Sequence, residues 1–314
     1  MSKKFSIIVP VYGNEFNLPT TIPYIVEHLN LFSGYETELI MVCDGSPDNS
    51  YEVMKQYQKK YPEIIKIAKF TRNFGQGAAV HCGMKMATGD VLGVISADLQ
   101  DPFELFVDML AYWEEGYKFV IGTRKKRHEK GLSVLASQAM HKLTQRFINK
   151  KYPKGGFDFY LLDRSMAQEF LKADAPNGST QLLLLWMGYE YKLIEYERKE
   201  RTIGKSGYNL KKRLNAALGF FVTYSNMPIR IFSIPVIVNV LLALAFLVVL
   251  IMGLVQNSEI LILLGTILLF LNIFMAIVLI AIMALGEYIW RIQDLSRTLP
   301  RYVIDELVDD TKKE

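Results

Sequence analysis

The chain has 314 residues, of which 51% are hydrophobic and 22% are charged, and its formal net charge is +4. The apolar content is too high for an ordinary soluble enzyme, and the apolar and charged residues occupy different parts of the chain. Lysines and arginines cluster at residues 124–130 and 198–230, but no nucleic-acid-binding motif accompanies them, so a nucleic-acid partner is not expected.

Strands and helices are expected to alternate from the start of the chain. Apolar runs predict buried strands at Phe5–Val11, Glu38–Cys43, Ile64–Phe70, Val91–Ile95 and Phe119–Arg124, with helices between the first four and after the fourth. This alternation predicts an α/β domain with a mostly parallel, doubly wound sheet. In such a sheet the functional edge is the one where the parallel strands end.

The fourth predicted strand ends in an acidic stretch, Ser96-Ala97-Asp98-Leu99-Gln100-Asp101-Pro102. In an extended chain, Asp98 and Gln100 would face the same side and could share one divalent cation that binds a phosphate. The alternative is an acidic turn that caps the helix starting near Pro102.

Two further strand ends are polar. Asp44 follows the second strand and precedes Gly45, so its carboxylate could accept hydrogen bonds from a ribose or a base, with a plain Asx-turn as the alternative. Gly75-Gln76-Gly77 does not complete the G-x-G-x-x-G fingerprint, because Val80 stands where the third glycine belongs. A dinucleotide-dependent dehydrogenase is therefore not expected.

A basic run begins at Arg124, beside the predicted acidic site. Arginine and lysine there would suit a substrate that carries phosphates, although a solvated charge run is the alternative. Asp158 lies among aromatic residues, an environment common for catalytic carboxylates. A helix cap is the alternative, and it fits Asp163 better than Asp158.

The last third of the chain predicts a membrane region. Residues 231–255 and 260–286 contain no charged side chain, and each run is longer than the roughly 20 residues that cross a bilayer as a helix. Residues 207–230 predict an amphipathic juxtamembrane helix, with a helix packed on the catalytic domain as the alternative. Residues 287–314 predict an amphipathic C-terminal tail.

The predicted hairpin should have both ends on the cytoplasmic side of the cell membrane. Gln256–Glu259 contains no lysine or arginine, whereas basic residues flank the hairpin at Arg230, Arg291, Arg297 and Arg301. Cys43 and Cys82 lack the spacing of a zinc site or a redox pair, which fits free thiols in a reducing compartment. Asn239 and Asn272 should face protein, either between the helices or between subunits of a homo-oligomer.

These features occur in an order that resembles a known family. The matching motifs are Val9-Pro10-Val11-Tyr12 with Asn14-Glu15, Asp44-Gly45-Ser46, Arg72-Asn73-Phe74-Gly75, Ala97 to Pro102, Gly122-Thr123-Arg124, Asp158-Phe159 with Leu161 to Arg164, and Arg201 with Gly204, Ser206 and Tyr208. They resemble the family 2 glycosyltransferases with the GT-A fold. Within that family they are similar to polyprenyl-phosphate glycosyltransferases such as dolichyl-phosphate mannose synthases and bacterial undecaprenyl-phosphate glucosyltransferases.

The resemblance implies a cytoplasmic GT-A domain at residues 1–206, followed by a transmembrane hairpin at residues 231–286. It implies inverting transfer of a sugar from a nucleoside diphosphate sugar, with UDP-glucose or UDP-N-acetylglucosamine as leading donors, to polyprenyl phosphate. The product would be a lipid-linked monosaccharide for cell-envelope glycosylation. The implied catalytic residues are Asp98, Arg124 and Asp158; Asp98 and Gln100 would hold Mg²⁺ or Mn²⁺. The implied nucleotide contacts are Pro10, Tyr12, Glu15, Asp44, Arg72, Gly75, Ser96 and Ala97, and the implied acceptor contacts are Arg124, Arg201, Lys205 and Ser206.

The sequence departs from the family pattern at several positions. The family usually has an acid where Ser96 stands and another where Cys43 stands, and many members have a polar or basic residue at the positions of Tyr160 and Gly207. A catalytically silent membrane scaffold is one alternative, suggested by Ser96. A processive polysaccharide synthase is another, although residues 181–186 lack the Q-x-x-R-W arrangement and two spans make a poor pore.

Overall fold

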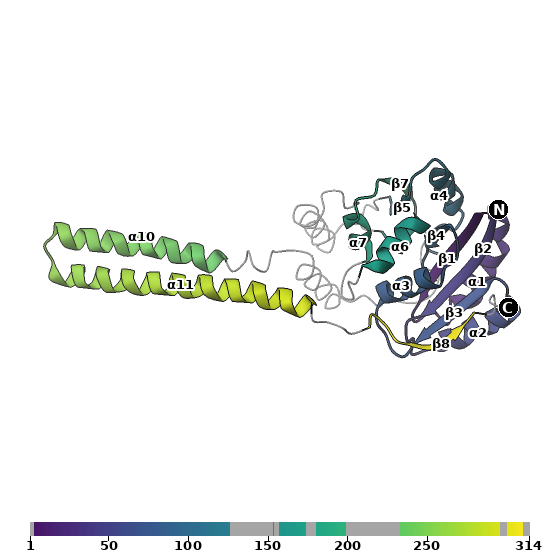
Figure 1. The fold of residues 1–314 in the computed structure, drawn as a ribbon, viewed down its shortest axis with the longest axis horizontal. Helices are drawn as coiled ribbons and strands as arrows, with labels where there is room; N and C mark the ends of the chain where they lie inside the picture. Colours follow the sequence, from purple (N-terminus) through teal and green to yellow (C-terminus); the bar gives the residue numbers. More distant parts are fainter. Residues whose placement is uncertain are drawn as a thin grey trace. The chain divides into compact units, whose positions relative to one another are not determined.

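The computed structural model describes residues 3–125, 153, 157–173, 180–198, 233–295 and 300–309 (Figure 1). The chain forms two compact units, one of residues 1–209 together with 300–314 and the other of residues 210–299. The predicted juxtamembrane helix at residues 207–230 and the predicted acceptor contacts Arg201, Lys205 and Ser206 lie outside the described residues.

The first unit is built on an eight-stranded sheet with the order β7-β5-β6-β4-β1-β2-β3-β8. The strands are β1 (Lys3–Val11), β2 (Tyr35–Cys43), β3 (Ile65–Phe70), β4 (Val91–Val94), β5 (Phe119–Arg124), β6 (Phe159–Asp163), β7 (Tyr191–Tyr196) and β8 (Ile304–Val308). The helices are α1 (Leu18–Glu27), the 3₁₀ turn η1 (Leu29–Phe32), α2 (Ser50–Lys60), α3 (Gln76–Met86), α4 (Leu105–Glu114), α6 (Arg164–Lys172) and α7 (Thr180–Trp186).

The sheet is mostly parallel, as the sequence predicts. β1 pairs in parallel with β2 and β4, β2 with β3, and β5 with β7. β6 is antiparallel to both of its neighbours, and it pairs Tyr160 with Val94, the last residue of β4. The start of β6 therefore lies at the edge where the parallel strands end, which brings residues before Phe159 to that edge.

Both faces of the sheet are covered, which explains why its central strands are continuous apolar runs. Successive side chains of a strand point to opposite faces. Ile7 and Val9 pack in one cluster with residues of α1, α2 and α4, whereas Ile8 packs in a second cluster with residues of α3, α6 and α7. All three side chains are fully buried.

The C-terminal segment adds an edge strand to this sheet. β8 runs antiparallel to β3, and it is drawn in yellow beside β3 in Figure 1. The sequence pattern predicts a single amphipathic tail at residues 287–314. The structure instead has the end of helix α11 in this range and then β8, which is held by backbone pairing with β3 and by ion pairs of Asp305 with Lys69 and of Glu306 with Lys55.

The second unit contains the two apolar helices, α10 (Ser233–Val255) and α11 (Glu259–Leu295). Each is long and apolar enough to cross a membrane, by length and composition. They pack closely, since a Cβ atom at Gly265 would lie 2.8 Å from the Cα atom of Leu250. Asn239 and Asn272 are only 7% and 8% exposed, so both side chains face protein, as predicted.

Candidate active site

The loops after β1 and β2 are joined to each other at the carboxyl edge of the sheet. The amide of Gly13 donates to Ser46 Oγ at 2.8 Å, and the amide of Glu15 donates to Asp48 Oδ2 at 3.1 Å. The Glu15 carboxylate in turn accepts from the Asn49 side chain at 2.9 Å. Glu15, a predicted nucleotide contact, therefore also braces the junction between these loops.

Asp44 holds a third loop, the one that follows β3. It is 3% exposed, and its two oxygens accept from the amides of Phe74 at 2.6 Å and Gly75 at 2.9 Å. Burial raises the pKa of Asp44, while the two amides and Arg72 act in the opposite direction. A Cβ atom at Gly45 would lie 2.1 Å from the Arg72 carbonyl carbon, so glycine is required where the loops meet. The carboxylate reaches across to another loop, and the plain Asx-turn alternative is wrong.

The other predicted nucleotide contacts differ in exposure. Tyr12 is 49% exposed and Arg72 is exposed, so both side chains are accessible. Pro10 lies within β1 and is half-buried. Ala97 is buried, and its carbonyl accepts from the Thr21 hydroxyl at 2.8 Å. The Ala97 side chain is therefore part of the core.

Ser96, which replaces the usual acid, connects two carboxylates. Its Oγ lies 2.8 Å from Asp98 Oδ1 and 2.9 Å from Asp101 Oδ2. One hydroxyl carries one proton, so it donates to one carboxylate at a time. Ser96 thus keeps Asp98 and Asp101 close together without adding a third negative charge.

Asp101 is the buried anchor of this cluster, although it is not among the site residues predicted from sequence. It is 1% exposed, and the hydroxyl of Tyr196, the last residue of β7, donates to its Oδ1. Arg198 Nε lies 3.5 Å from the same oxygen. Burial and Asp101 raise the pKa of Tyr196, so the hydroxyl stays protonated as a donor. Asp101 belongs to the acidic stretch identified in the sequence. Its partners Tyr196 and Arg198 lie at and just after the end of β7, a distant strand that no sequence motif marks.

Asp98 and Gln100 offer a small set of oxygen ligands for a divalent cation. Leu99 has φ 50°, so the chain turns between them, and the extended-chain reasoning behind their shared side is wrong. Among the residues that the structure describes, no group of three or more His, Cys, Asp or Glu side chains could hold a metal ion. One carboxylate and one amide oxygen nevertheless fit Mg²⁺ or Mn²⁺, because such ions take most of their remaining ligands from substrate phosphates and water.

Arg124 and Asp158 form an ion pair at the same edge. Arg124 ends β5, Asp158 immediately precedes the antiparallel β6, and Arg124 Nη2 lies 3.3 Å from Asp158 Oδ2. Gln181, on α7, donates to the other Asp158 oxygen at 3.1 Å. Burial by itself would lower the pKa of the Arg124 guanidinium. The interactions with Tyr196, Asp101 and Asp158 outweigh this effect, so the pKa is raised. Gln181 was missed as a partner because α7 carries no motif.

Asp163, at the opposite end of β6, has a structural role. It is the N-cap of α6, where its side chain accepts from the amide of Ser165 at 2.8 Å. It also accepts from Trp113 Nε1 at 2.9 Å. The prediction that Asp163, rather than Asp158, caps a helix is confirmed.

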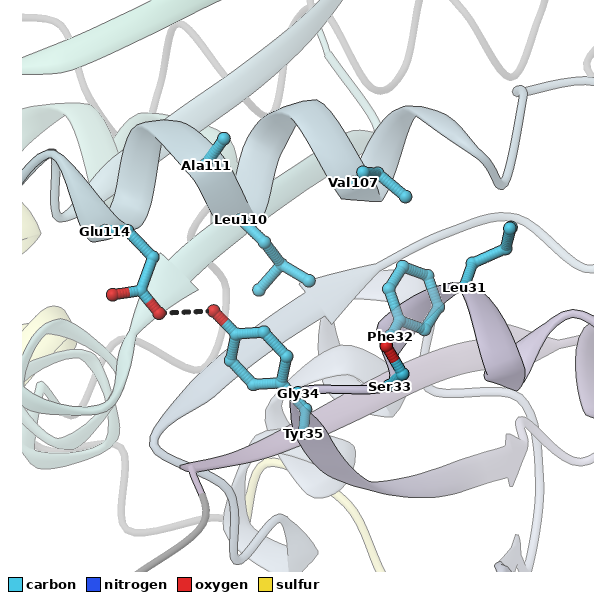
Figure 2. Close-up of a pocket in the computed structure, with 9 residues that line it drawn as sticks. All are labelled: Leu31, Phe32, Ser33, Gly34, Tyr35, Val107, Leu110, Ala111 and Glu114. Carbon is cyan, nitrogen blue, oxygen red and sulfur yellow. Dashed lines mark hydrogen bonds between the residues drawn. The ribbon is translucent and has the colours of Figure 1, made fainter.

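A separate pocket lies between α4 and the segment around η1 (Figure 2). It is lined by Leu31, Phe32, Ser33, Gly34, Tyr35, Val107, Leu110, Ala111 and Glu114, and Tyr35 donates to Glu114 across it at 2.6 Å. None of the predicted site residues lines this pocket, so the candidate active site remains the loop-covered edge of the sheet.

Comparisons with known proteins identify the family. The family model of glycosyl transferase family 2 matches residues 6–171. The chain is 33% identical over 305 residues to the uncharacterized glycosyltransferase YkcC of Bacillus subtilis (strain 168), covering 96% of this chain and 94% of that protein. It is 30% identical over 307 residues to the bactoprenol glucosyl transferase of Shigella phage SfV, covering 96% of this chain and 98% of that protein.

A solved structure shares the fold. The mannosyltransferase PcManGT from Pyrobaculum calidifontis, solved in complex with GDP-Man and Mn²⁺, is 14% identical and superposes with a TM-score of 0.50. The match covers 71% of this chain and 63% of that one. The GT-A-like fold and the sequence matches agree, and the chain belongs to glycosyl transferase family 2 as a glycosyltransferase.

Proposed function

We propose that this glycosyltransferase moves a sugar from a nucleoside diphosphate sugar to a polyprenyl phosphate, with inversion at the anomeric carbon. Relatives named bactoprenol glucosyl transferase match 96% of the chain, which supports a polyprenyl phosphate as the acceptor. UDP-glucose is the leading donor and UDP-N-acetylglucosamine the second.

One observation carries the proposal: Asp98 follows β4, Arg124 ends β5 and Asp158 precedes β6, and these three neighbouring strands bring the residues to one edge of the sheet. The site thus combines a carboxylate suited to a cation with an arginine suited to phosphate and a second carboxylate. The same chain continues into two helices that are long and apolar enough to cross a membrane, which suits an enzyme with a lipid acceptor.

On the donor side, the reaction breaks the bond between the anomeric carbon and the diphosphate oxygen, which leaves with the electron pair. Mg²⁺ or Mn²⁺ on Asp98 and Gln100 would neutralise charge on the diphosphate, and PcManGT, which shares the fold, was solved with both Mn²⁺ and a nucleotide sugar. Arg124 stabilises the same developing charge through its guanidinium. Tyr12, Asp44 and Arg72 hold the nucleotide.

On the acceptor side, a phosphate oxygen attacks the anomeric carbon from the opposite face and forms the new bond. This oxygen is already largely ionised at neutral pH, since the second pKa of a phosphate monoester is about 6. A strong general base is therefore not needed. Asp158, fixed by Arg124 and Gln181, orients the acceptor, and Arg201, Lys205 and Ser206 bind its phosphate.

We further propose that α10 and α11 form a transmembrane hairpin, with the catalytic domain and both termini on the cytoplasmic face of the cell membrane. The chain enters α10 from the first unit, and after α11 it returns to the first unit as β8. If both helices cross the bilayer, their outer ends must lie on the side of the catalytic domain. Basic residues at Arg230 and Arg291 favour the cytoplasm.

The test is an assay of the full-length chain in detergent with undecaprenyl phosphate, Mn²⁺ and a panel of labelled nucleotide sugars. A lipid-linked monosaccharide of inverted configuration is the expected product, with UDP-glucose preferred. A polymer would indicate a processive synthase. If no donor gives any product, and a cooperative thermal transition shows that the protein is folded, the proposal is refuted and a catalytically silent scaffold is favoured.

A further inference from the structure

The segment that follows the second apolar helix is attached to the strand that precedes the nucleotide loop. We call residues 301–309 the C-terminal clasp and residues 71–75 the nucleotide loop. β8 of the clasp pairs with β3, and the amide of Thr71 donates to the carbonyl of Val303 at 3.1 Å. The ladder shifts register between Lys69 and Phe70, at the point where β3 passes into the loop.

A chain of three aromatic rings connects the clasp to the nucleotide loop. Tyr302 stacks on Phe70 with ring centroids 4.7 Å apart and an interplanar angle of 11°. Phe70 is fully buried and contacts Phe74 edge-to-face at 5.8 Å. The guanidinium of Arg72 lies 4.0 Å from the centre of the Phe74 ring. Tyr302 therefore supports, through Phe70, the ring against which Arg72 is held.

The nucleotide loop is held on its other side by Asp44, which accepts from the amides of Phe74 and Gly75. Phe74 is thus fixed by its backbone to Asp44 and by its ring to the aromatic chain. Removing the aromatic support would leave Phe74 and Gly75, the latter at φ +99°, to be ordered by their backbone hydrogen bonds to Asp44.

Ion pairs attach the clasp independently of Tyr302. Glu306 Oε2 lies 2.9 Å from Lys55 Nζ, and Asp305 Oδ2 lies 2.9 Å from Lys69 Nζ. Leu307 is 54% exposed, so the outer face of β8 buries little apolar surface. The strand is consequently expected to remain docked when the single ring of Tyr302 is removed.

We propose that Tyr302 is a positioning residue for the donor: the C-terminal clasp orders the nucleotide loop, so that donor affinity depends on chain beyond the second apolar helix. This inference rests on the proposed function, because it takes Arg72 and Asp44 to lie at the nucleotide. Tyr302 does not itself touch the donor. It acts through Phe70 and Phe74.

The experiment compares Tyr302→Ala, Tyr302→Phe and Leu307→Ala in the full-length chain. Calorimetric titration with UDP-glucose and Mn²⁺ gives donor affinity, hydrogen exchange gives the protection of the Phe74 and Gly75 amides, and kinetics give KM for each substrate. Tyr302→Ala should weaken donor binding about fivefold to tenfold and speed exchange at both amides, with kcat and acceptor KM within twofold. Tyr302→Phe keeps the stack and should bind donor like wild type, as should Leu307→Ala, which changes an exposed side chain of the same strand.

The outcomes separate the two proposals. A Tyr302→Ala protein with wild-type donor affinity and wild-type exchange would refute the positioning role while leaving the proposed function intact. Equal losses in Tyr302→Ala and Leu307→Ala, or loss of protection throughout β2 and β3, would also refute it, since they would indicate general destabilisation. Wild-type protein that binds none of the nucleotide sugars would refute the proposed function, and the positioning role with it.

Discussion

The structure predicts that Asp158→Asn separates catalysis from stability. Within the described part of the chain, the Asp158 side chain contacts Arg124 at 3.3 Å and Gln181 at 3.1 Å, and the Arg124 and Asp158 side chains are 36% and 40% exposed. Ion pairs with this exposure contribute about 0–1 kcal/mol to stability. The asparagine has the same shape, so unfolding free energy should fall by no more than about 1 kcal/mol.

The effect on turnover should be larger. If Asp158 orients the acceptor at the reacting centre, its replacement should lower kcat by about 100-fold, which corresponds to about 2.7 kcal/mol in the activation free energy. Donor affinity should stay within twofold, because the nucleotide contacts lie on other loops. Steady-state kinetics with undecaprenyl phosphate, calorimetry with the nucleotide sugar and thermal unfolding measure the three quantities on one preparation.

Asp163→Ala is the matched control, since Asp163 lies at the other end of the same strand. Loss of the helix cap and loss of the hydrogen bond from Trp113 should each lower the free energy of unfolding by about 1 kcal/mol. The kcat of this variant per folded molecule should be unchanged. An Asp158→Asn protein with wild-type kcat, or one destabilised as much as Asp163→Ala, would refute the assignment.

Four other predictions concern the cation, the core, the topology and pH. Asp98→Ala should abolish Mn²⁺-dependent donor binding in calorimetry, and wild-type binding would remove the metal assignment. Lys66→Met should cost about 3–5 kcal/mol in denaturant unfolding, because it removes the buried cation that lies 3.0 Å from Glu38, a carboxylate that is itself 1% exposed. A cysteine at Ser258 should react with thiol reagents only from the periplasmic or outer side, and cytoplasmic labelling would reverse the topology. Burial lowers the pKa of His81 to about 4, so the unfolded chain binds a proton at this residue more readily than the folded protein does. The free energy of unfolding should therefore decrease as the pH falls from 6.5 toward 4, and it should decrease less in His81→Gln. Thermal unfolding across this pH range tests that sign, and equal acid sensitivity of both proteins would contradict it.

Strands β1 to β5 were predictable from sequence because burial makes them largely continuous apolar runs with little ambiguity. The parallel strand β7 was not, because most of its side chains are half-buried or exposed. β8 was not, since Ile304–Val308 contains Asp305 and Glu306 and half of it faces solvent. Its structure depends on Lys55 and Lys69, which are far away in the chain. No local pattern encodes such an ion-paired edge strand.

In the candidate site, too, some features were predictable from sequence and others were not. Asp44, Asp98 and Arg124 were identified because each ends or follows a predicted strand. Asp158 was identified from its aromatic neighbours and the family motif, since β6 was not predicted. The geometry between neighbouring residues was not, since the left-handed backbone at Leu99 turns Asp98 away from an extended arrangement with Gln100. The partners of Asp101 and Asp158, namely Tyr196 and Gln181, depend on the packing of β7 and α7 against the sheet.

The serine at position 96 changes the electrostatics of the cluster rather than dismantling it. Its hydroxyl lies within 3 Å of Asp98 and Asp101, and Asp101 is buried, so an acid in its place would bring a third carboxylate into contact with two others. Two like charges 4 Å apart repel by about 4 kcal/mol at an effective dielectric constant of 20. A bound cation would offset such repulsion. With Ser96, the cluster forms around Tyr196 and Arg198 without a cation, so in the proposed reaction Asp98 would already be oriented when the donor diphosphate brings its own negative charge.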